Sequence, residues 1–204
     1  MPRGFSNKEK THIRTTLKQT AFEHFCRLGL RKTSIGQITK DSGIAQGSFY
    51  SFFHSKEELF YELLLDEERR LKNKLHPFLT TSRPDQDNFA RFLLTAVQEI
   101  EASPLISTLF QAEEYQALIR KVNDAELDDH TLKDLEELKP IFEGWQERGF
   151  MKDIEPELII SSIRSFILLS LHKKEIGPDW FDETVRLMAA SLAAYVMKGD
   201  RRDD

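Results

Sequence analysis

One short pattern recurs three times in the first 58 residues, a serine followed three positions later by glutamate or glutamine. The copies read Ser-Asn-Lys-Glu at 6–9, Ser-Ile-Gly-Gln at 34–37 and Ser-Lys-Glu-Glu at 55–58. The serine oxygen can accept a hydrogen bond from a backbone N–H at a helix start, and the longer side chain can return one to the serine N–H. We expect the first helix to end at Gly29, and all three helix starts then lie within about 60 residues.

The second of these helices has the spacing of a helix-turn-helix motif. We expect a helix over about 35–41, a positive φ at Gly43, a return of Ile44 into the core, and a second helix over about 45–52. In such motifs the second helix enters the DNA major groove and leads with its N-terminal residues. The spacing therefore predicts a small DNA-binding domain.

Four of the five residues from 49 to 53 are aromatic, and the spacing divides them between two faces. Phe49 and Phe52 lie three apart and are expected to point inward, while Phe53 packs against the next helix. Tyr50 is expected to face outward, where its O–H can reach a phosphate. Because a helix this short is marginal in water, it needs that tertiary packing to form.

Charge is distributed unevenly along the chain. Residues 1–56 hold ten Lys and Arg against three Asp and Glu, a net charge of +7, whereas the whole chain carries −5. A basic segment on an acidic protein favours a polyanionic partner for that segment. Charge and helix spacing together therefore indicate double-stranded DNA.

Beyond residue 54, apolar residues recur at helical spacing almost throughout, and strand-like alternation is nearly absent. Proline and glycine separate the helices that we expect near 55–75, 85–101, 104–121, 128–148, 156–174 and 179–198. The sequence therefore predicts an all-α protein of two domains. Residues 1–54 would form a three-helix helix-turn-helix domain, and residues 55–204 a helical regulatory and dimerisation domain.

The stretch TSIGQITKDSGIAQGSFYSFFHSKEELF resembles the DNA-binding signature of the TetR (tetracycline-repressor-like) family of bacterial transcription regulators. The resemblance covers about residues 8–65. It implies an operator DNA partner and a helical C-terminal domain that dimerises and holds an effector pocket. The positions that it implies for DNA contact are Ser34, Gln46, Gly47, Ser48, Tyr50, Ser51 and Lys56.

The residues themselves suggest roles for these positions. Gly47 lets the helix backbone approach DNA closely, while Gln46 and Ser48 beside it can reach base edges, glutamine pairing naturally with adenine. Lys56 stands at the start of the next helix, where backbone N–H groups already favour a phosphate.

Two further sets of residues are predicted in the C-terminal domain. The abundant aromatic residues can line a pocket between helices for a small apolar or aromatic effector, for which we select Phe110, Tyr115, Phe142, Trp145 and Phe166. Apolar stripes on the last two long helices can pair two copies into a homodimer. The stripe residues are Ile159, Ile163, Phe166, Ile167, Val185, Ala189, Leu192 and Val196.

Other classes of protein find less support. The chain has no phosphate-cradling glycine motif and no clustered zinc-ligand spacing, so we expect no enzyme, metal or cofactor. The single cysteine, Cys26, is typical of a reducing cytoplasm, and no apolar run is long enough for a membrane span. We therefore expect a cytoplasmic DNA-binding regulator, namely a repressor released by its effector. The alternatives are a ligand-independent or activating regulator, or a helical ligand-binding or interaction protein without DNA binding.

Overall fold

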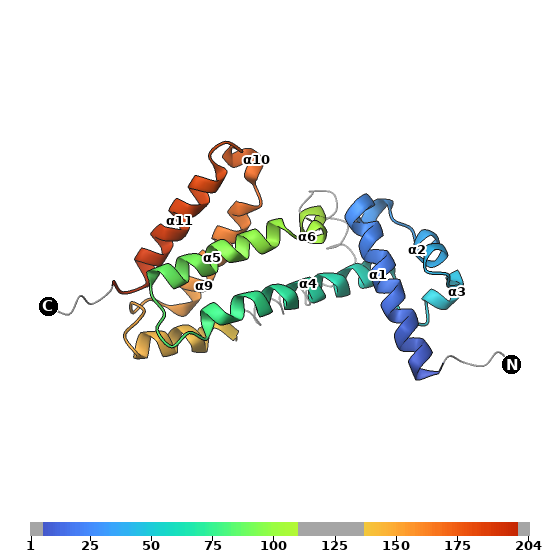
Figure 1. Cartoon of the computed structure of the whole chain (residues 1–204), viewed down its shortest axis with the longest axis horizontal. Coiled ribbons are helices and arrows are strands. Elements are labelled where there is room, and N and C mark those ends of the chain that lie inside the picture. Colours follow the sequence, from blue (N-terminus) through green and yellow to red (C-terminus); the bar gives the residue numbers. More distant parts are fainter. Residues whose placement is uncertain (1–5, 110–136, 200–204) are drawn as a thin grey trace. The chain divides into compact units, whose positions relative to one another are not determined.

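The structure is a computed structural model, and it describes residues 6–109 and 137–199. Those ranges are helical, and their one strand-like pairing is an isolated bridge between Met151 and Met197, which confirms the all-α expectation. Residues 137–147 are helical as well. The labelled helices in Figure 1 are α1 (Asn7–Lys32), α2 (Ile35–Asp41), α3 (Gln46–Phe49), α4 (Lys56–Leu79), α5 (Gln86–Glu101), α6 (Pro104–Leu109), α9 (Pro156–Ser170), α10 (Lys173–Ile176) and α11 (Phe181–Val196).

The chain divides into two compact units, each with its own core. Among the described residues, the N-terminal unit holds 6–69 and 103–109, and the C-terminal unit holds 70–102 and 137–199. The chain crosses between the units inside α4 and again between Ala102 and Ser103. The predicted functional boundary at residue 54 stays a prediction.

Local signals set the helices of the N-terminal unit. The two capping boxes predicted at Ser6 and Ser34 are both present, and α2 has the predicted bounds. Gly29 has a φ of 80° and interrupts α1 at the predicted place, but one further turn continues to Lys32. Gly43 has the expected positive φ of 68° in the turn between α2 and α3.

The core of the N-terminal unit is built from rings and branched aliphatic side chains. Phe25 of α1 meets Phe60 of α4 edge to face, with ring centroids 5.0 Å apart. This contact joins the first helix to the fourth, and α6 also packs on α1. The fully buried large side chains here are Leu17, Phe25, Leu30, Ile38, Phe49, Phe53, Leu59 and Phe60.

Helix α4 departs from the prediction that it ends near Leu75, before a proline. It continues through Pro77 to Leu79, and the N–H of Thr80 closes the last turn on the carbonyl of His76, at 3.1 Å. A proline removes only one helical hydrogen bond, and close to a helix end few turns are disturbed. Phe78 and Leu79 pack against the C-terminal core and hold this last turn.

The C-terminal unit is centred on α5, α9 and α11, which contact one another in pairs (Figure 1). Their inward faces share one apolar cluster that includes Phe89, Phe142, Trp145 and Phe181. The predicted helix over 156–174 is two helices, because the chain turns at Leu171 and His172 between α9 and α10. In the described ranges, no helix combines the length and apolar character that a membrane crossing requires.

Candidate nucleic-acid interface

The second helix of the motif is shorter than predicted. Helix α3 covers only Gln46–Phe49, and the N–H groups of Ser51 and Phe52 bond to carbonyls three residues back, at 3.1 and 2.9 Å. Such bonds tighten a helix end into a turn. Phe52 is half-buried, whereas Phe49 and Phe53 are fully buried as predicted.

An arginine of α1 holds the end of this short helix in place. Nη1 of Arg14 donates to the carbonyl of Phe52 at 2.9 Å, and its guanidinium carbon lies 4.4 Å from the centre of the Phe53 ring. Nη2 pairs with the Glu62 carboxylate on α4. One side chain therefore ties α1, the end of α3 and α4 together.

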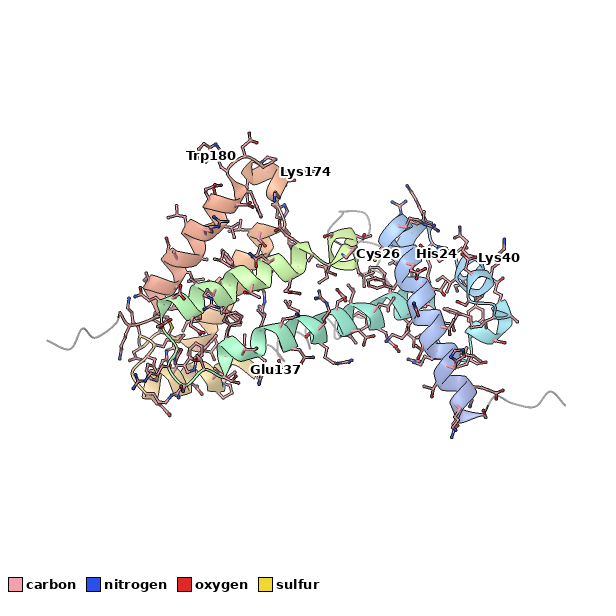
Figure 2. The ribbon with its side chains drawn as sticks, viewed as in Figure 1. His24, Cys26, Lys40, Glu137, Lys174 and Trp180 are labelled. Carbon is pink, nitrogen blue, oxygen red and sulfur yellow. The ribbon has the colours of Figure 1, made fainter. Side chains whose placement is uncertain are left out.

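A buried histidine holds α2 against α1. Figure 2 labels His24 on α1. Its Nε2 lies 2.8 Å from Oδ2 of Asp41, and Nη2 of Arg27 lies 3.4 Å from its Nδ1. Arginine has donors only, so Nδ1 accepts and Nε2 carries the proton that is donated to Asp41. The tautomer is thus assigned from the partners of the ring, and the chain Arg27–His24–Asp41 fixes the end of α2.

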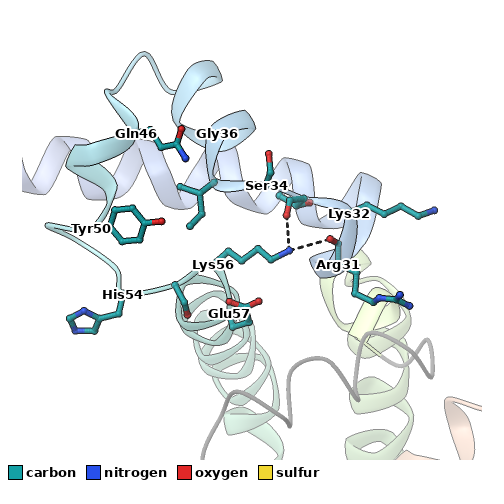
Figure 3. A pocket seen from close by; sticks show the side chains of 12 residues that line it. Arg31, Lys32, Ser34, Gly36, Gln46, Tyr50, His54, Lys56 and Glu57 are labelled. Carbon is teal, nitrogen blue, oxygen red and sulfur yellow. Dashed lines mark hydrogen bonds between the residues drawn. The ribbon is translucent and has the colours of Figure 1, made fainter.

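An open cleft of about 620 Å³ runs across the motif (Figure 3). Tyr50 stands at its side, 55% exposed, with its ring edge-on to Phe49 at 5.6 Å. Polar and basic side chains therefore line a surface supported from behind by buried rings. The lining residues are Arg31, Lys32, Thr33, Ser34, Ile35, Gly36, Gln46, Tyr50, His54, Ser55, Lys56 and Glu57.

The structure brings four of the seven predicted DNA contacts into this cleft, namely Ser34, Gln46, Tyr50 and Lys56. Gly47, Ser48 and Ser51 lie outside its lining. A Cβ atom placed on Gly47 would meet no atom of the chain within 4 Å, so the packing of the chain itself does not require glycine there. The role of all seven residues in DNA contact stays a prediction.

Sequence reasoning missed several lining residues, above all Arg31, Lys32 and His54. The signal for the first two is their position, since a basic pair stands directly before the Thr-Ser that starts α2. His54 lies in the turn before α4, where the expected helix pattern carries no information about side-chain direction.

Cys26 is half-buried on α1, and burial raises the pKa of its thiol above the ordinary value. The Glu67 carboxylate adds to this pKa increase through charge repulsion. Little reactive thiolate is therefore present near neutral pH. In the described parts of the chain, no three His, Cys, Asp or Glu side chains are grouped to hold a metal ion.

The predicted effector and dimer residues fall largely in the C-terminal core. Phe142, Trp145 and Phe166 are buried there, with the Phe142 and Trp145 rings 5.7 Å apart, while Phe110 and Tyr115 lie outside the described residues. Of the dimer stripe, Ile167 and Leu192 are half-buried. The other stripe residues, which the core of their own chain buries, are Ile159, Ile163, Phe166, Val185, Ala189 and Val196.

Comparison with known proteins gives a family match in the N-terminal region and likenesses that cover three quarters or more of the chain. The model described as "Bacterial regulatory proteins, tetR family" matches residues 19–63. The uncharacterized HTH-type transcriptional regulator YhgD of Bacillus subtilis (strain 168) is 26% identical over 188 residues, 89% of this chain and 93% of YhgD. The HTH-type transcriptional repressor KstR2 of Rhodococcus jostii (strain RHA1) is 26% identical over 156 residues, 76% of each chain.

A solved structure shares the fold across both units. The TetR-family transcriptional regulator from Pectobacterium atrosepticum superposes with a TM-score of 0.69 at 19% identity, covering 92% of this chain and 94% of that one. The likeness therefore extends well beyond the helix-turn-helix.

Proposed function

We propose that this chain, which belongs to the TetR family of bacterial transcription regulators, is a repressor that binds double-stranded operator DNA and leaves it when a small apolar or aromatic effector binds. The cleft between α2, α3 and the start of α4 carries the proposal. Its lining includes the polar side chains of Gln46 and Tyr50 and the basic side chain of Lys32. Glutamine amides read base edges, while hydroxyl and ammonium groups suit phosphates.

The test begins with recovery of genomic fragments by the full chain, followed by titration of one recovered site at several salt concentrations. Gln46→Ala should relax preference at one base pair per half-site, by roughly 1–3 kcal/mol. Tyr50→Phe should weaken binding to all sequences alike. Lys32→Ala should lower the slope of log affinity against log salt by about 0.9, the release of one counterion.

Lys174→Ala is the matched control, because Lys174 is an exposed lysine of α10 in the C-terminal unit (Figure 2). It should leave both affinity and salt slope unchanged. Equal effects from Lys174→Ala and Lys32→Ala would mean that the cleft is not the DNA-binding surface. Failure to retain any fragment would instead favour a helical ligand-binding or interaction protein.

The effector proposal rests on the aromatic side chains that are buried in the C-terminal core. Phe142 and Trp145 lie in contact, and Phe166 belongs to the same buried cluster. A ligand that enters between these rings must be apolar, because charged groups lose their hydration in such surroundings. The repressor role is supported by the likeness to KstR2, which is named a transcriptional repressor.

Tryptophan fluorescence tests the effector proposal directly. The only other tryptophan, Trp180, is 70% exposed, so Trp180→Phe leaves Trp145 as the sole reporter. An apolar effector should change the Trp145 signal and weaken operator binding, and operator should weaken effector binding by the same factor. A ligand that binds at Trp145 without changing operator affinity would leave a ligand-independent regulator as the better description.

For the homodimer, we propose an interface on the outward faces of α9 and α11. Most residues of the predicted stripe are buried in the core of their own chain and offer little area to a partner. These faces carry exposed large apolar side chains, including Leu169 of α9 and Leu187 of α11. Ala190, Ser191 and Ala194 are exposed on α11 as well, and small side chains allow helices to approach closely. A two-fold dimer would present two α3 helices to the two halves of an operator.

Sedimentation tests the dimer. Leu187→Glu should convert a micromolar dimer to monomer, because it places a charge in an apolar interface. Gln98→Glu adds the same charge on the exposed side of α5 and serves as the control. If Leu187→Glu and Gln98→Glu both remain dimeric, the interface lies elsewhere, and a monomeric wild-type chain would exclude the dimer altogether.

A further inference from the structure

The first residue of α4 is Lys56, and its ammonium lies at the C-terminal end of α1. Nζ of Lys56 donates to the carbonyl oxygens of Leu30, Arg31 and Thr33, at 2.6, 3.2 and 2.8 Å. Figure 3 draws the bonds to Arg31 and Thr33. A lysine ammonium has three N–H donors. All three are therefore used within the chain.

The start of α2 explains why these carbonyls need an outside donor. The amide that would serve the Leu30 carbonyl four residues on is that of Ser34, and it donates to Oε1 of Gln37 instead, at 2.9 Å. Thr33 follows α1 with extended backbone angles, φ −79° and ψ 135°, so its carbonyl lies outside the helical hydrogen-bond pattern. The Gln37 amide, four residues on, donates to Oγ of Ser34 at 3.2 Å. The capping box of α2 thus leaves the carbonyls at the end of α1 to another donor.

Electrostatics favour a cation at this place. The C-terminal end of a helix carries partial negative charge on its unpaired carbonyls. Leu30 and Thr33 are almost completely buried, so unpaired carbonyls there would be costly. The lysine supplies both the hydrogen bonds and the positive charge.

We propose that Lys56 is a positioning residue that fastens the start of α4 to the junction of α1 and α2 and so fixes the geometry of the cleft, rather than a ligand of a DNA phosphate. The inference deepens the proposed function and rests on it, since the cleft is the proposed DNA-binding surface. An ammonium that already serves three carbonyls has no donor left for a phosphate. Lys32, exposed in the same cleft, remains available for that contact.

The test compares Lys56→Met with Lys32→Met in the full chain. Methionine keeps most of the length of the Lys56 side chain and removes its donors. Affinity for the operator and for unrelated DNA is measured against salt, at a temperature where circular dichroism shows each variant to be folded. For Lys56→Met we expect operator affinity to fall roughly tenfold or more, because strong charge-assisted hydrogen bonds within the chain are lost. The salt slope should stay unchanged, because Lys56 itself contacts no phosphate.

The ratio of operator affinity to affinity for unrelated DNA separates positioning from simple stabilisation. If the cleft residues are displaced, contacts to base edges should weaken more than the attraction to DNA phosphates. This ratio should therefore fall for Lys56→Met. Lys32→Met should lower the salt slope by about 0.9 and keep the ratio. A lower slope with a preserved ratio for Lys56→Met would make Lys56 a phosphate ligand, and unchanged affinities would likewise overturn the proposal.

Two further measurements keep the outcome decisive. If Lys56→Met does not fold, Lys56→Arg retains charge and donors and should restore binding with the wild-type salt slope, whereas a changed slope would contradict the proposal. Thermal unfolding is read without DNA, with Lys40→Met of the exposed α2 surface as control. A wild-type chain that binds no DNA would remove the proposed function, yet equal unfolding temperatures for Lys56→Met and Lys40→Met would separately remove the fastening role.

Discussion

Both units have an apolar core, but they differ in how far polar contacts help to join their helices. In the N-terminal unit, side-chain cations reach backbone carbonyls, as Arg14 does at Phe52 and Lys56 does at the end of α1. In the C-terminal unit, α5, α9 and α11 share one continuous apolar cluster, centred on residues such as Phe89 and Phe142. The first arrangement is directional and depends on single side chains, and the second is distributed over many contacts.

The difference follows from helix length and from what each unit must expose. Helices α2 and α3 have seven and four residues, too few to bury a wide apolar face. In the proposed function, the surface of α3 also stays polar to meet DNA. Directed hydrogen bonds can fix such elements without adding apolar area. The long helices of the C-terminal unit gain most of their stability from burial.

The largest effect that this comparison predicts is the loss of one ring from the C-terminal core. Phe142 is completely buried, with Phe89 and Trp145 rings 6.2 and 5.7 Å away. Phe142→Ala should lower the free energy of unfolding by about 3–5 kcal/mol, since it leaves a cavity among packed rings. Denaturant unfolding followed by circular dichroism measures the change.

Leu187→Ala is the control for the cavity, because Leu187 is 68% exposed on α11. It should change the stability of the chain, measured at one protein concentration where the monomer prevails, by no more than about 0.5 kcal/mol. A loss below about 1 kcal/mol for Phe142→Ala would mean that the ring already lines an open pocket. That outcome would contradict the tightly packed core and strengthen the effector site.

Arg14→Met should lower the free energy of unfolding less than Phe142→Ala does, but it should weaken operator binding more. This change removes the hydrogen bond to Phe52 and the ion pair to Glu62. Because the side chain is partly exposed, we expect a stability loss of about 1 kcal/mol. The loss of binding free energy for the operator should exceed this loss of stability, because the turn that follows α3 is no longer held in place.

The C-terminal unit offers a matched arginine. The Arg91 guanidinium carbon lies 5.7 Å from the centre of the Phe78 ring, and Nη1 is 3.8 Å from the Asp87 carboxylate. Arg91→Met should leave stability and operator affinity nearly unchanged. Equal losses of operator affinity for the two variants would show that the carbonyl contact of Arg14 has no special role in placing α3.

The sequence alone predicts the features of the N-terminal unit that are decided within a few residues. The capping boxes at Ser6 and Ser34 and the positive φ of Gly43 depend on local spacing and backbone sterics, and all three are present. At Ser55 the pattern is met in part, because Glu58 accepts from the His54 amide while its own amide bonds to Ser55. The exposed position of Tyr50 also follows from helical spacing.

Features that depend on distant contacts could not be predicted in this way. A stripe such as Ile159, Ile163 and Phe166 shows that one face of α9 is buried, but periodicity does not say whether its own core or a second chain buries it. Likewise, no local pattern shows that Phe78 and Leu79 pack on the core and extend α4, or that the Lys56 ammonium reaches carbonyls 23–26 residues away.

The smallest expected effect comes from a surface ion pair in the C-terminal unit. Nζ of Lys139 lies 2.6 Å from Oε1 of Glu157 and joins helical residues 137–147 to α9. The hydrogen bond from Lys139 lowers the pKa of the Glu157 carboxyl, and the same bond raises the pKa of Lys139. Both groups are exposed, so salt and water weaken the pair.

The pH dependence of this pair has a definite sign. Glu157 contributes stability above its unfolded-state pKa, and that contribution is lost as pH falls through its lowered folded-state pKa. Lys139 contributes below its unfolded-state pKa, and that contribution is lost as pH rises through its raised folded-state pKa. A double-mutant cycle of Lys139→Met and Glu157→Gln, read by thermal unfolding, should therefore show a small coupling at neutral pH that vanishes in acid and in high salt. The comparison would be contradicted by a coupling that persists in acid, or by one as large as the stability loss for Arg14→Met. Either result would mean that a directional polar contact, and not apolar burial alone, contributes strongly to the stability of the C-terminal unit.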